Sequence, residues 1–407
     1  MSSILVPPLS ESTRTRPRMQ QVCLELSNLA RELGAGAKLP TVVELRSSLG
    51  VSLTTLSGAL DLLEKRGIIE RVHGHGIFVA QNHALSPRIA VICEQNFLAN
   101  QTSPFWKILM ESVEDRARRA DETLETHFAQ SHGVDVTAPL LASPQGLQPS
   151  LVADIEAGRI AGVLGIGLPL TQSFWLRDQK IPFVAFAAMG RGMVTTDRAQ
   201  LLEKGLAELG RLGCRRVGVG VIVLPHLVFL DRLQRVRGQY EQLHSQVAEF
   251  CARFGLEFSP ELIGDDREFL EEALRAENLD FLRRVRGRVS PQEFGFELVQ
   301  KWWRLPAEKR PDGLIFGVDL CTHGALAALR QLGVEPGRDV QIATHSNWHS
   351  PLLMGHDHHL IRLEYDTYEI VNALFEMLEA QIGGETMHEV QRPVFPHLRR
   401  PTQPDSF

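Results

Sequence analysis

Side chains that can hydrogen-bond to nucleic acid are concentrated between residues 52 and 57. Ser52, Thr54, Thr55 and Ser57 carry hydroxyl groups there, and the tetrapeptide His73-Gly74-His75-Gly76 follows shortly after. Hydroxyls and imidazoles can bond to phosphate oxygens and to the edges of bases. The basic side chains around them that could reach phosphates are Lys38, Arg46, Lys65, Arg66 and Arg71, with an arm of Arg14, Arg16 and Arg18 ahead of the first helix.

Two short helices are expected to position the hydroxyl groups. Thr41 can cap a helix that runs through Leu49, and Gly50 supplies the turn after it. Ser52 can cap a second helix. The apolar residues of that second helix recur at helical spacing, and they are Leu56, Ala59, Leu60 and Leu63.

A glycine-tipped hairpin is expected to follow the second helix. Gly67 ends the helix after two basic residues, and strands are predicted at Ile68–Val72 and Ile77–Ala80. Helix, turn, helix and hairpin is the order of a winged helix-turn-helix. In that fold the second helix enters the major groove of DNA and the hairpin, or wing, touches the backbone or the minor groove.

This segment resembles the DNA-binding domain of GntR-type bacterial transcription regulators. Their usual pattern runs LPSEREL, then GVSRTTVREAL, then a leucine-rich turn and GL-x-x-x-x-G-x-G-T-F-V. The matching residues are Leu39, Pro40, Glu44, Leu45, Gly50, Val51, Ser52, Thr54, Thr55, Ala59, Leu60, Gly67, Gly74, Gly76, Phe78 and Val79. The predicted DNA-contacting set is Lys38, Thr41, Arg46, Ser52, Thr54, Thr55, Ser57, Arg71, His73, Gly74 and His75.

Three positions depart from the pattern. Val43, Leu53 and Ser57 stand where this family commonly carries arginines that contact DNA. Arginine can bond to guanine or fork onto a phosphate, and leucine can do neither. The resemblance therefore predicts the scaffold, but not the usual operator sequence of the family. Any one of the surface residues could also be only a solvated side chain.

Composition and charge fit a soluble regulator of two or three domains. The chain has 407 residues and a formal net charge of −6. Residues 1–83 contain nine Lys and Arg against seven Asp and Glu, whereas the remainder contains 34 against 42, so the acidic balance lies outside the DNA-binding segment. No apolar run reaches the roughly 18 residues of a membrane span, and no signal peptide is recognisable. We expect a cytoplasmic protein, with Cys23, Cys93, Cys214, Cys251 and Cys321 reduced.

Beyond a short polar linker at residues 81–87, strands and helices alternate. RIAVICE at 88–94 and RIAGVLGIG at 159–167 read as buried strands, and a helical pattern follows the first. Strands that are apolar throughout, each followed by a helix, predict parallel sheets covered on both faces. The length of this region favours two α/β lobes.

The order again resembles a known family, the periplasmic-binding-protein-like sensor domain of the lactose-repressor (LacI) family. The longest matching stretch is RPDGLIFGVDLCTHGALAALRQLGVEPGRDVQIATHSN at 310–347, and the likeness is weak at 131–158 and 256–305. A GntR-type head on such a body is the layout of the arabinose-repressor group. The predicted fold is α/β, with a winged helix-turn-helix at 1–83 followed by a two-lobed, type I parallel α/β domain at 88–405 for effector binding and dimerisation.

The resemblance implies an effector site between the lobes. Carboxylates suit polyols, aromatic rings stack on the apolar face of a sugar, and arginine binds ring oxygens or acids. Ser346 replaces an aspartate that is usual there, which puts a plain hexose or pentose in doubt. Asp197 and Asp319 could instead be helix caps, and Phe105 and Trp106 could be packing between the lobes. The implied positions are Asn96, Phe97, Phe105, Trp106, Asp197, Arg235, Val318, Asp319, Ser346 and Asn347.

Two further patterns are weaker indications of a functional site. Five histidines crowd into residues 345–359, but their spacing fits no defined metal geometry, so no metal is predicted. GVLGIGLPL lacks the lysine of a phosphate loop, and the body carries no nucleophile elbow or other catalytic signature. We expect neither a cofactor nor enzyme activity.

The sequence thus predicts a homodimeric bacterial repressor of a carbohydrate-related operon, bound to palindromic operator DNA and controlled by a small molecule, a sugar or sugar derivative. Two alternatives stay open. One is a regulator that has lost effector sensing and keeps the sensor fold for dimerisation. The other is a binding protein or enzyme with an appended DNA-binding head.

Overall fold

The structure is a computed structural model. It describes residues 18–65, 67–80, 88–95, 102–120, 122–130, 142–222, 233–267, 290–385 and 390–401.

The N-terminal domain has the predicted order of elements. The helices are α1 (Arg18–Leu33), α2 (Val42–Leu49) and α3 (Leu53–Lys65), and the antiparallel wing strands are β1 (Ile69–Val72) and β2 (Gly76–Val79). Strand β1 begins one residue later than predicted, and β2 has the predicted length but begins and ends one residue earlier. All three helices and both strands bury apolar side chains in one core of their own, so this domain has an independent centre of packing.

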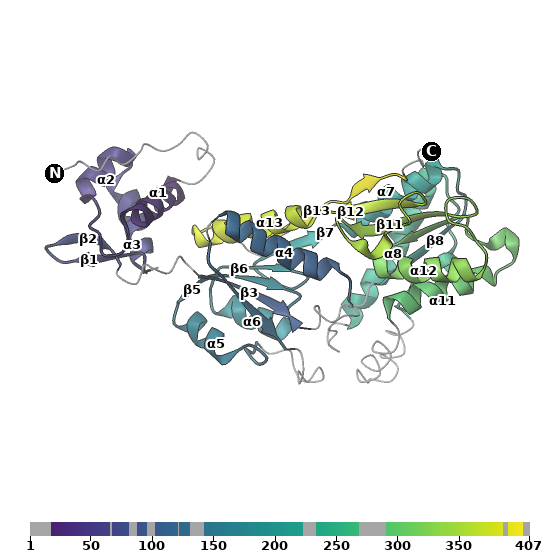
Figure 1. Cartoon of the computed structure of the whole chain (residues 1–407), viewed down its shortest axis with the longest axis horizontal. Helices are drawn as coiled ribbons and strands as arrows, with labels where there is room; N and C mark the ends of the chain where they lie inside the picture. The colour runs from purple at the N-terminus through teal and green to yellow at the C-terminus, as the bar shows by residue number, and fades with distance from the viewer. Residues whose placement is uncertain are drawn as a thin grey trace.

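The first lobe of the body is a six-stranded parallel sheet in the order β13-β7-β6-β5-β3-β4. Helix α13 packs on β5, β6 and β7 and against α4, whereas α5 and α6 cover the opposite face (Figure 1). The strands are β3 (Arg88–Glu94), β4 (Leu124–Ala129), β5 (Ile160–Ile166), β6 (Phe183–Phe186), β7 (Gly192–Thr196) and β13 (Val390–Val394). The helices are α4 (Phe105–Arg119), α5 (Pro149–Glu156), α6 (Leu170–Asp178) and α13 (Thr367–Ile382).

The second lobe is a six-stranded sheet in the order β14-β12-β11-β10-β8-β9. Helix α7 packs on β10, β11 and β12 and against α8, and α11 and α12 cover the other face. The strands are β8 (Val217–Val221), β9 (Ile263–Asp265), β10 (Gly313–Phe316), β11 (Gln341–Asn347), β12 (Leu360–Tyr365) and β14 (His397–Arg399). The helices are α7 (Arg198–Arg211), α8 (Leu233–Phe254), α11 (Pro291–Trp303), α12 (Asp319–Gln331) and the 3-10 turns η4 (Pro260–Leu262), η5 (Ala307–Lys309) and η6 (Pro351–Leu353).

Strand β14 corrects one expectation. It runs antiparallel to β12, with Leu398 opposite Leu363, so the sheet of the second lobe is not wholly parallel. Its side chains are exposed. A short edge strand with exposed side chains need not satisfy the apolar pattern that parallel, doubly covered strands require.

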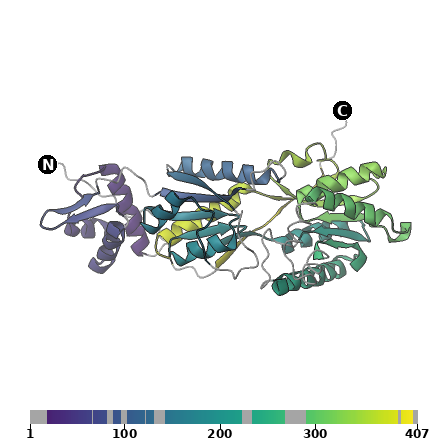
Figure 2. The same cartoon turned by 90° about the horizontal axis from the view of Figure 1, so that it is seen from below.

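The lobes lie side by side, and within the described residues the chain crosses between them at three points (Figures 1 and 2). These are between β7 and α7, between β12 and α13, and between β13 and β14. At the crossings the Asp197 backbone N–H donates to the Val394 carbonyl over 3.0 Å, and the Tyr365 hydroxyl donates to the Asp197 carbonyl over 2.8 Å. One apolar core runs through both lobes on the side of α4, α13, α7 and α8.

Helices α11 and α12 approach unusually closely through glycine. A Cβ built on Gly295 would lie 2.0 Å from the Cys321 carbonyl oxygen, and one on Gly324 would lie 1.8 Å from that of Gln292. Contacts this short are impossible for real atoms, so only glycine permits the observed spacing of the two backbones. None of the described helices is both long and apolar enough to span a membrane.

Candidate DNA-binding surface and ligand cleft

The two helices of the N-terminal motif are held by the predicted caps. Thr41 forms a capping box with Glu44, in which the Thr41 backbone N–H donates to the Glu44 carboxylate over 2.8 Å. These hydrogen bonds hold the pKa of Glu44 below its usual range. Gly50 ends α2 with φ of 62°, a left-handed conformation that suits glycine. The predicted helix boundaries at Thr41 and Gly50 are confirmed.

The hydroxyl groups of α3 divide into two kinds. Ser52 accepts the Thr55 backbone N–H over 3.1 Å, and its hydroxyl lies 2.7 Å from the Thr55 hydroxyl, so these two groups serve the helix end. Thr54 and Ser57 are exposed. The first pair positions the helix, and the second pair is available at its surface.

The cationic side chains of this domain also differ in their surroundings. Arg46 is exposed in the last turn of α2. The Lys38 ammonium lies 5.7 Å from the centre of the Phe78 ring. Arg71, which the sequence suggested for phosphate contact, is paired within the protein: its guanidinium lies 2.6 Å from Asp61 on α3.

Glu64 on α3 binds the main chain of Arg71: the Arg71 backbone N–H donates to the Glu64 carboxylate over 3.1 Å. Arg71 therefore ties the wing to α3.

The wing tip keeps its imidazoles on the surface. His73, Gly74 and His75 are exposed, and the His75 backbone N–H donates to Val72 over 2.9 Å to close the turn. Gly74 and Gly76 have φ of 76° and 118°. Arg14, Arg16 and Arg66 lie outside the described residues, as do the side chains of Arg18 and Lys65.

In the body, Asp319 connects the two lobes. It is the first residue of α12 and only 1% exposed. Its carboxylate accepts the Ser103 hydroxyl of the first lobe over 3.0 Å and the Asn347 amide over 3.1 Å. The carboxylate also accepts the Leu320 backbone N–H over 2.8 Å. The predicted ligand carboxylate is thus engaged by the protein itself in this arrangement of the lobes.

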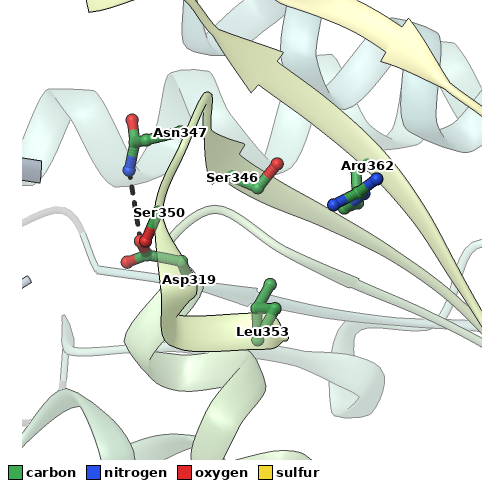
Figure 3. Close-up of a pocket in the computed structure, with 6 residues that line it drawn as sticks. All are labelled: Asp319, Ser346, Asn347, Ser350, Leu353 and Arg362. Atoms are coloured by element: carbon green, nitrogen blue, oxygen red, sulfur yellow. Dashed lines mark hydrogen bonds between the residues drawn. The ribbon is translucent and has the colours of Figure 1, made fainter. Parts of the chain in front are cut away.

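A small pocket lies beside that carboxylate, with room for little more than one water molecule. The Ser346 hydroxyl is buried and has no hydrogen-bond partner in the described part of the chain. Figure 3 shows the Asn347 amide bonded to Asp319, with Arg362 on the neighbouring strand. The lining residues are Asp319, Ser346, Asn347, Ser350, Leu353 and Arg362.

His345 directly precedes the pocket residue Ser346 on β11 and is half-buried. Its ring centre lies 5.4 Å from that of Tyr365, and its Nδ1 finds no hydrogen-bond partner among the described residues. Burial lowers the pKa of His345, although the nearby Asp319 carboxylate acts in the opposite direction. The imidazole is therefore neutral at neutral pH, a donor or acceptor rather than a charge.

The two predicted aromatic residues form a cluster at the start of α4. Phe105 is buried and Trp106 half-buried, with ring centres 5.0 Å apart and edge to face. Both rings also lie near Phe186 at the end of β6, at 5.8 and 6.1 Å. Phe105 therefore belongs to the core of the first lobe, and Trp106 keeps part of its ring accessible.

Asp197 caps α7, as the alternative reading of this residue expected: its carboxylate accepts the Gln200 backbone N–H over 2.9 Å. Arg235 lies on α8, and its side chain is not among those described. Asn96 and Phe97 also lie outside the described residues. The structure thus groups Asp319, Ser346 and Asn347, with Asp197 at the crossing between the lobes.

Two residues that sequence reasoning missed, Arg198 and Asp266, join this region. Arg198, next to Asp197, is exposed and makes no hydrogen bond or ion pair with any described residue. Desolvation by the surrounding protein lowers the pKa of its guanidinium, whereas Asp266 and the tyrosines Tyr365 and Tyr240 raise it.

Asp266 is buried beyond the end of β9, where its carboxylate accepts the Tyr240 hydroxyl over 2.8 Å. Position at the carboxyl end of a strand was the available signal, but Asp266 falls where the sequence likeness is weak.

The histidine-rich segment holds no group of ligands arranged for a metal ion among the described residues. Burial lowers the pKa of His356, and the neighbouring His359 and His323 lower it further.

Comparisons with known proteins separate the two parts. Residues 20–79 match the family described as bacterial regulatory proteins, gntR family. An uncharacterized HTH-type transcriptional regulator of Bacillus subtilis, YydK, is 35% identical over 82 residues, which is 20% of this chain. The chain spans 34% of the length of that relative.

Solved regulators share the fold of the body. A regulatory protein of the LacI family from Chloroflexus aggregans has a TM-score of 0.55 at 16% identity, covering 76% of this chain and 96% of its own. The transcriptional regulator CelR in complex with cellobiose has a TM-score of 0.52 at 17% identity, covering 94% and 98%. CcpA of Lactococcus lactis has a TM-score of 0.52 at 15% identity, covering 78% and 100%. The chain therefore joins a gntR-family helix-turn-helix domain, at residues 20–79, to a two-lobed α/β body with the fold of LacI-family regulators.

Proposed function

We propose that this protein is a cytoplasmic transcription regulator that represses a carbohydrate-related operon. It acts as a homodimer on double-stranded operator DNA, and a small molecule bound between its lobes controls it. The observation that carries the proposal is the joining of a gntR-type DNA-binding domain to a two-lobed body with polar groups at the junction of its lobes. A carbohydrate is supported by the cellobiose complex of one structural neighbour.

On the DNA side, α3 is the recognition helix and the wing supports it. Thr54 and Ser57 can reach base edges, while Arg46 and Lys38 contact phosphates. The hydrogen-bonded pair Ser52 and Thr55 holds the start of α3 in place. Two such heads read the two halves of a palindromic operator.

On the effector side, the Ser103–Asp319 hydrogen bond is the contact that a ligand would replace. A ligand hydroxyl that bonds to the Asp319 carboxylate competes with Ser103 of the other lobe, so ligand binding and lobe arrangement are linked. Arg198 supplies a positive charge and the exposed part of Trp106 an apolar surface. A different lobe arrangement changes the distance between the two DNA-binding heads.

One alternative function is supported by a specific observation. The Asp319 carboxylate is already bonded to Ser103, Asn347 and its own helix, and the adjacent pocket is very small. A regulator that senses no ligand, and uses the body for dimerisation alone, would have such a closed junction. The two proposals differ in whether any small molecule stabilises the protein.

Thermal unfolding in the presence of sugars, sugar acids and sugar phosphates tests the proposal. At least one compound should raise the melting temperature of the wild type and weaken its binding to operator in a gel shift. Arg198→Ala should weaken that compound about tenfold or more, because a hydrogen bond to a charged group contributes about 1.5–3 kcal/mol. Arg235→Ala should weaken binding of the same compound to a similar extent.

Arg338→Ala is the matched control, since this arginine is exposed and pairs with Asp339 and Glu335 away from the lobe junction. It should keep the full response. A library that stabilises neither wild type nor variants would favour the regulator without an effector. A ligand whose affinity survives Arg198→Ala would place its site elsewhere.

A further inference from the structure

Leu53 is a large apolar side chain that the fold does not use. It is the first residue of α3 and 52% exposed. The apolar core of the domain takes Leu56, Ala59 and Leu60 from the same helix, and Leu53 is not part of it. Folding therefore gives no reason for a leucine at this position.

The surroundings of Leu53 are those of a surface that reads bases. The N-terminal residues of a recognition helix are the ones that contact base edges in the major groove. Ser52 and Thr55 have their hydroxyls bound to each other, so Leu53 and Thr54 are the side chains that the first turn presents outward. Of these two side chains, that of Leu53 can form no hydrogen bond with a base.

An apolar side chain in the major groove has one specific partner. Each base pair presents a different set of groups there, and thymine alone among the four bases presents a methyl group. We propose that Leu53 recognises a thymine in each operator half-site through contact with its C5 methyl group. This inference rests on the proposed DNA-binding function and adds the chemical feature that the operator must contain.

Val43 provides a comparison within the same domain. It is 75% exposed and lies in the first turn of α2. The first helix of such a motif crosses the DNA backbone, whereas the second enters the groove. Exposure of an apolar side chain is common to both residues, but only Leu53 lies on the element that reaches base edges.

The experiment begins with selection of the operator from random duplexes by the full-length protein. Each thymine of one selected half-site is then replaced singly by deoxyuridine, which removes the methyl group and leaves every hydrogen-bonding group in place. At one position the replacement should weaken wild-type binding about fourfold, the worth of one buried methyl-sized group.

Leu53→Ala should bind the thymine and uracil duplexes equally at that position. Its melting temperature should stay close to that of the wild type, because the side chain is not in the core. Val43→Ala should keep the full fourfold difference.

Three results would overturn the inference. One is a wild type that is insensitive to every thymine-to-uracil replacement, although it binds the selected operator tightly. Another is a Leu53→Ala variant that keeps the sensitivity. Selection of no sequence at all would remove the inference together with the proposed DNA-binding function.

Discussion

Glu208 on α7 is a buried carboxylate held by two arginines. It is 4% exposed, and it accepts Arg211 over 2.7 Å and Arg400 over 2.7 Å. Hydrogen bonds from Arg211, and then from Arg400, outweigh burial and lower its pKa to about 2. Since Arg400 directly follows β14, this carboxylate fastens the last strand of the second lobe to α7.

The lowered pKa predicts how stability depends on pH. A carboxylate whose pKa is lower in the folded protein stabilises the fold above its ordinary pKa, about 4.5, and loses that contribution as the pH falls towards 2. Glu208→Gln should lower the free energy of unfolding by roughly 2 kcal/mol at pH 7. The difference from wild type should shrink below pH 4.5 and vanish near pH 2.

Glu249→Gln serves as the control in the same denaturation series. Glu249 on α8 pairs with Arg253, but its side chain is 64% exposed, so its loss should cost less than about 0.5 kcal/mol at any pH. A Glu208→Gln variant with a pH-independent deficit would mean that packing, and not charge, is what Glu208 contributes.

Among the elements, the pair α11 and α12 depends most on backbone proximity. Its two helices meet at Gly295 and Gly324, each directly under a carbonyl oxygen of the other helix. Because the obstacle is main chain on both sides, no side-chain rotation can make room for a methyl group. The start of α12 carries Asp319, so the spacing of this pair also fixes the carboxylate that meets the first lobe.

Gly324→Ala should therefore be strongly destabilising, by about 3 kcal/mol or more, since overpacking against backbone forces the helices apart. Gly238→Ala is the matched change, because Gly238 is exposed within α8 and a Cβ there meets nothing within 4 Å. That variant should be stabilised by about 0.5–1 kcal/mol through helix propensity. Chemical denaturation measures both. Equal stabilities for the two variants would mean that α11 and α12 can separate at little cost.

At the scale of the whole molecule, the DNA-binding domain and the body are separate centres of packing. The core of the N-terminal domain contains only residues from Val22 to Val79, whereas the largest body core runs through both lobes. This division allows an effector to alter the body without unfolding the DNA-binding domain. In the proposed homodimer, one head contributes only half of the operator contacts.

Fragments test that division. Residues 1–83 should fold alone and bind a single half-site weakly, and the full-length protein should bind a two-half-site operator at least about a hundredfold more tightly, because the second contact becomes intramolecular. Moving the half-sites apart by half a helical turn should abolish that gain. Fluorescence anisotropy on labelled duplexes measures all three. Tight operator binding by a fragment of residues 88–407 would contradict the arrangement.

The sequence alone determined the local parts of this protein. Thr41, Gly50 and Ser52 act on groups within a few residues of themselves, so α2 and α3 could be predicted with their boundaries. The buried strands β3 and β5 were predictable too, because strands covered on both faces must be apolar throughout. Strand β12, which includes Arg362 and Glu364, and the exposed edge strand β13 lack that pattern and were missed.

Only the tertiary structure decided the junction of the lobes. The sequence named Asp319, but its partner Ser103 lies 216 residues away, and no local pattern encodes that contact. Arg198 and Asp266 likewise interact electrostatically although the first follows β7 of one sheet and the second follows β9 of the other, so only the packing of the lobes brings that interaction about. Caps and strand patterns depend on neighbours along the chain, whereas a cleft depends on how completed lobes pack together.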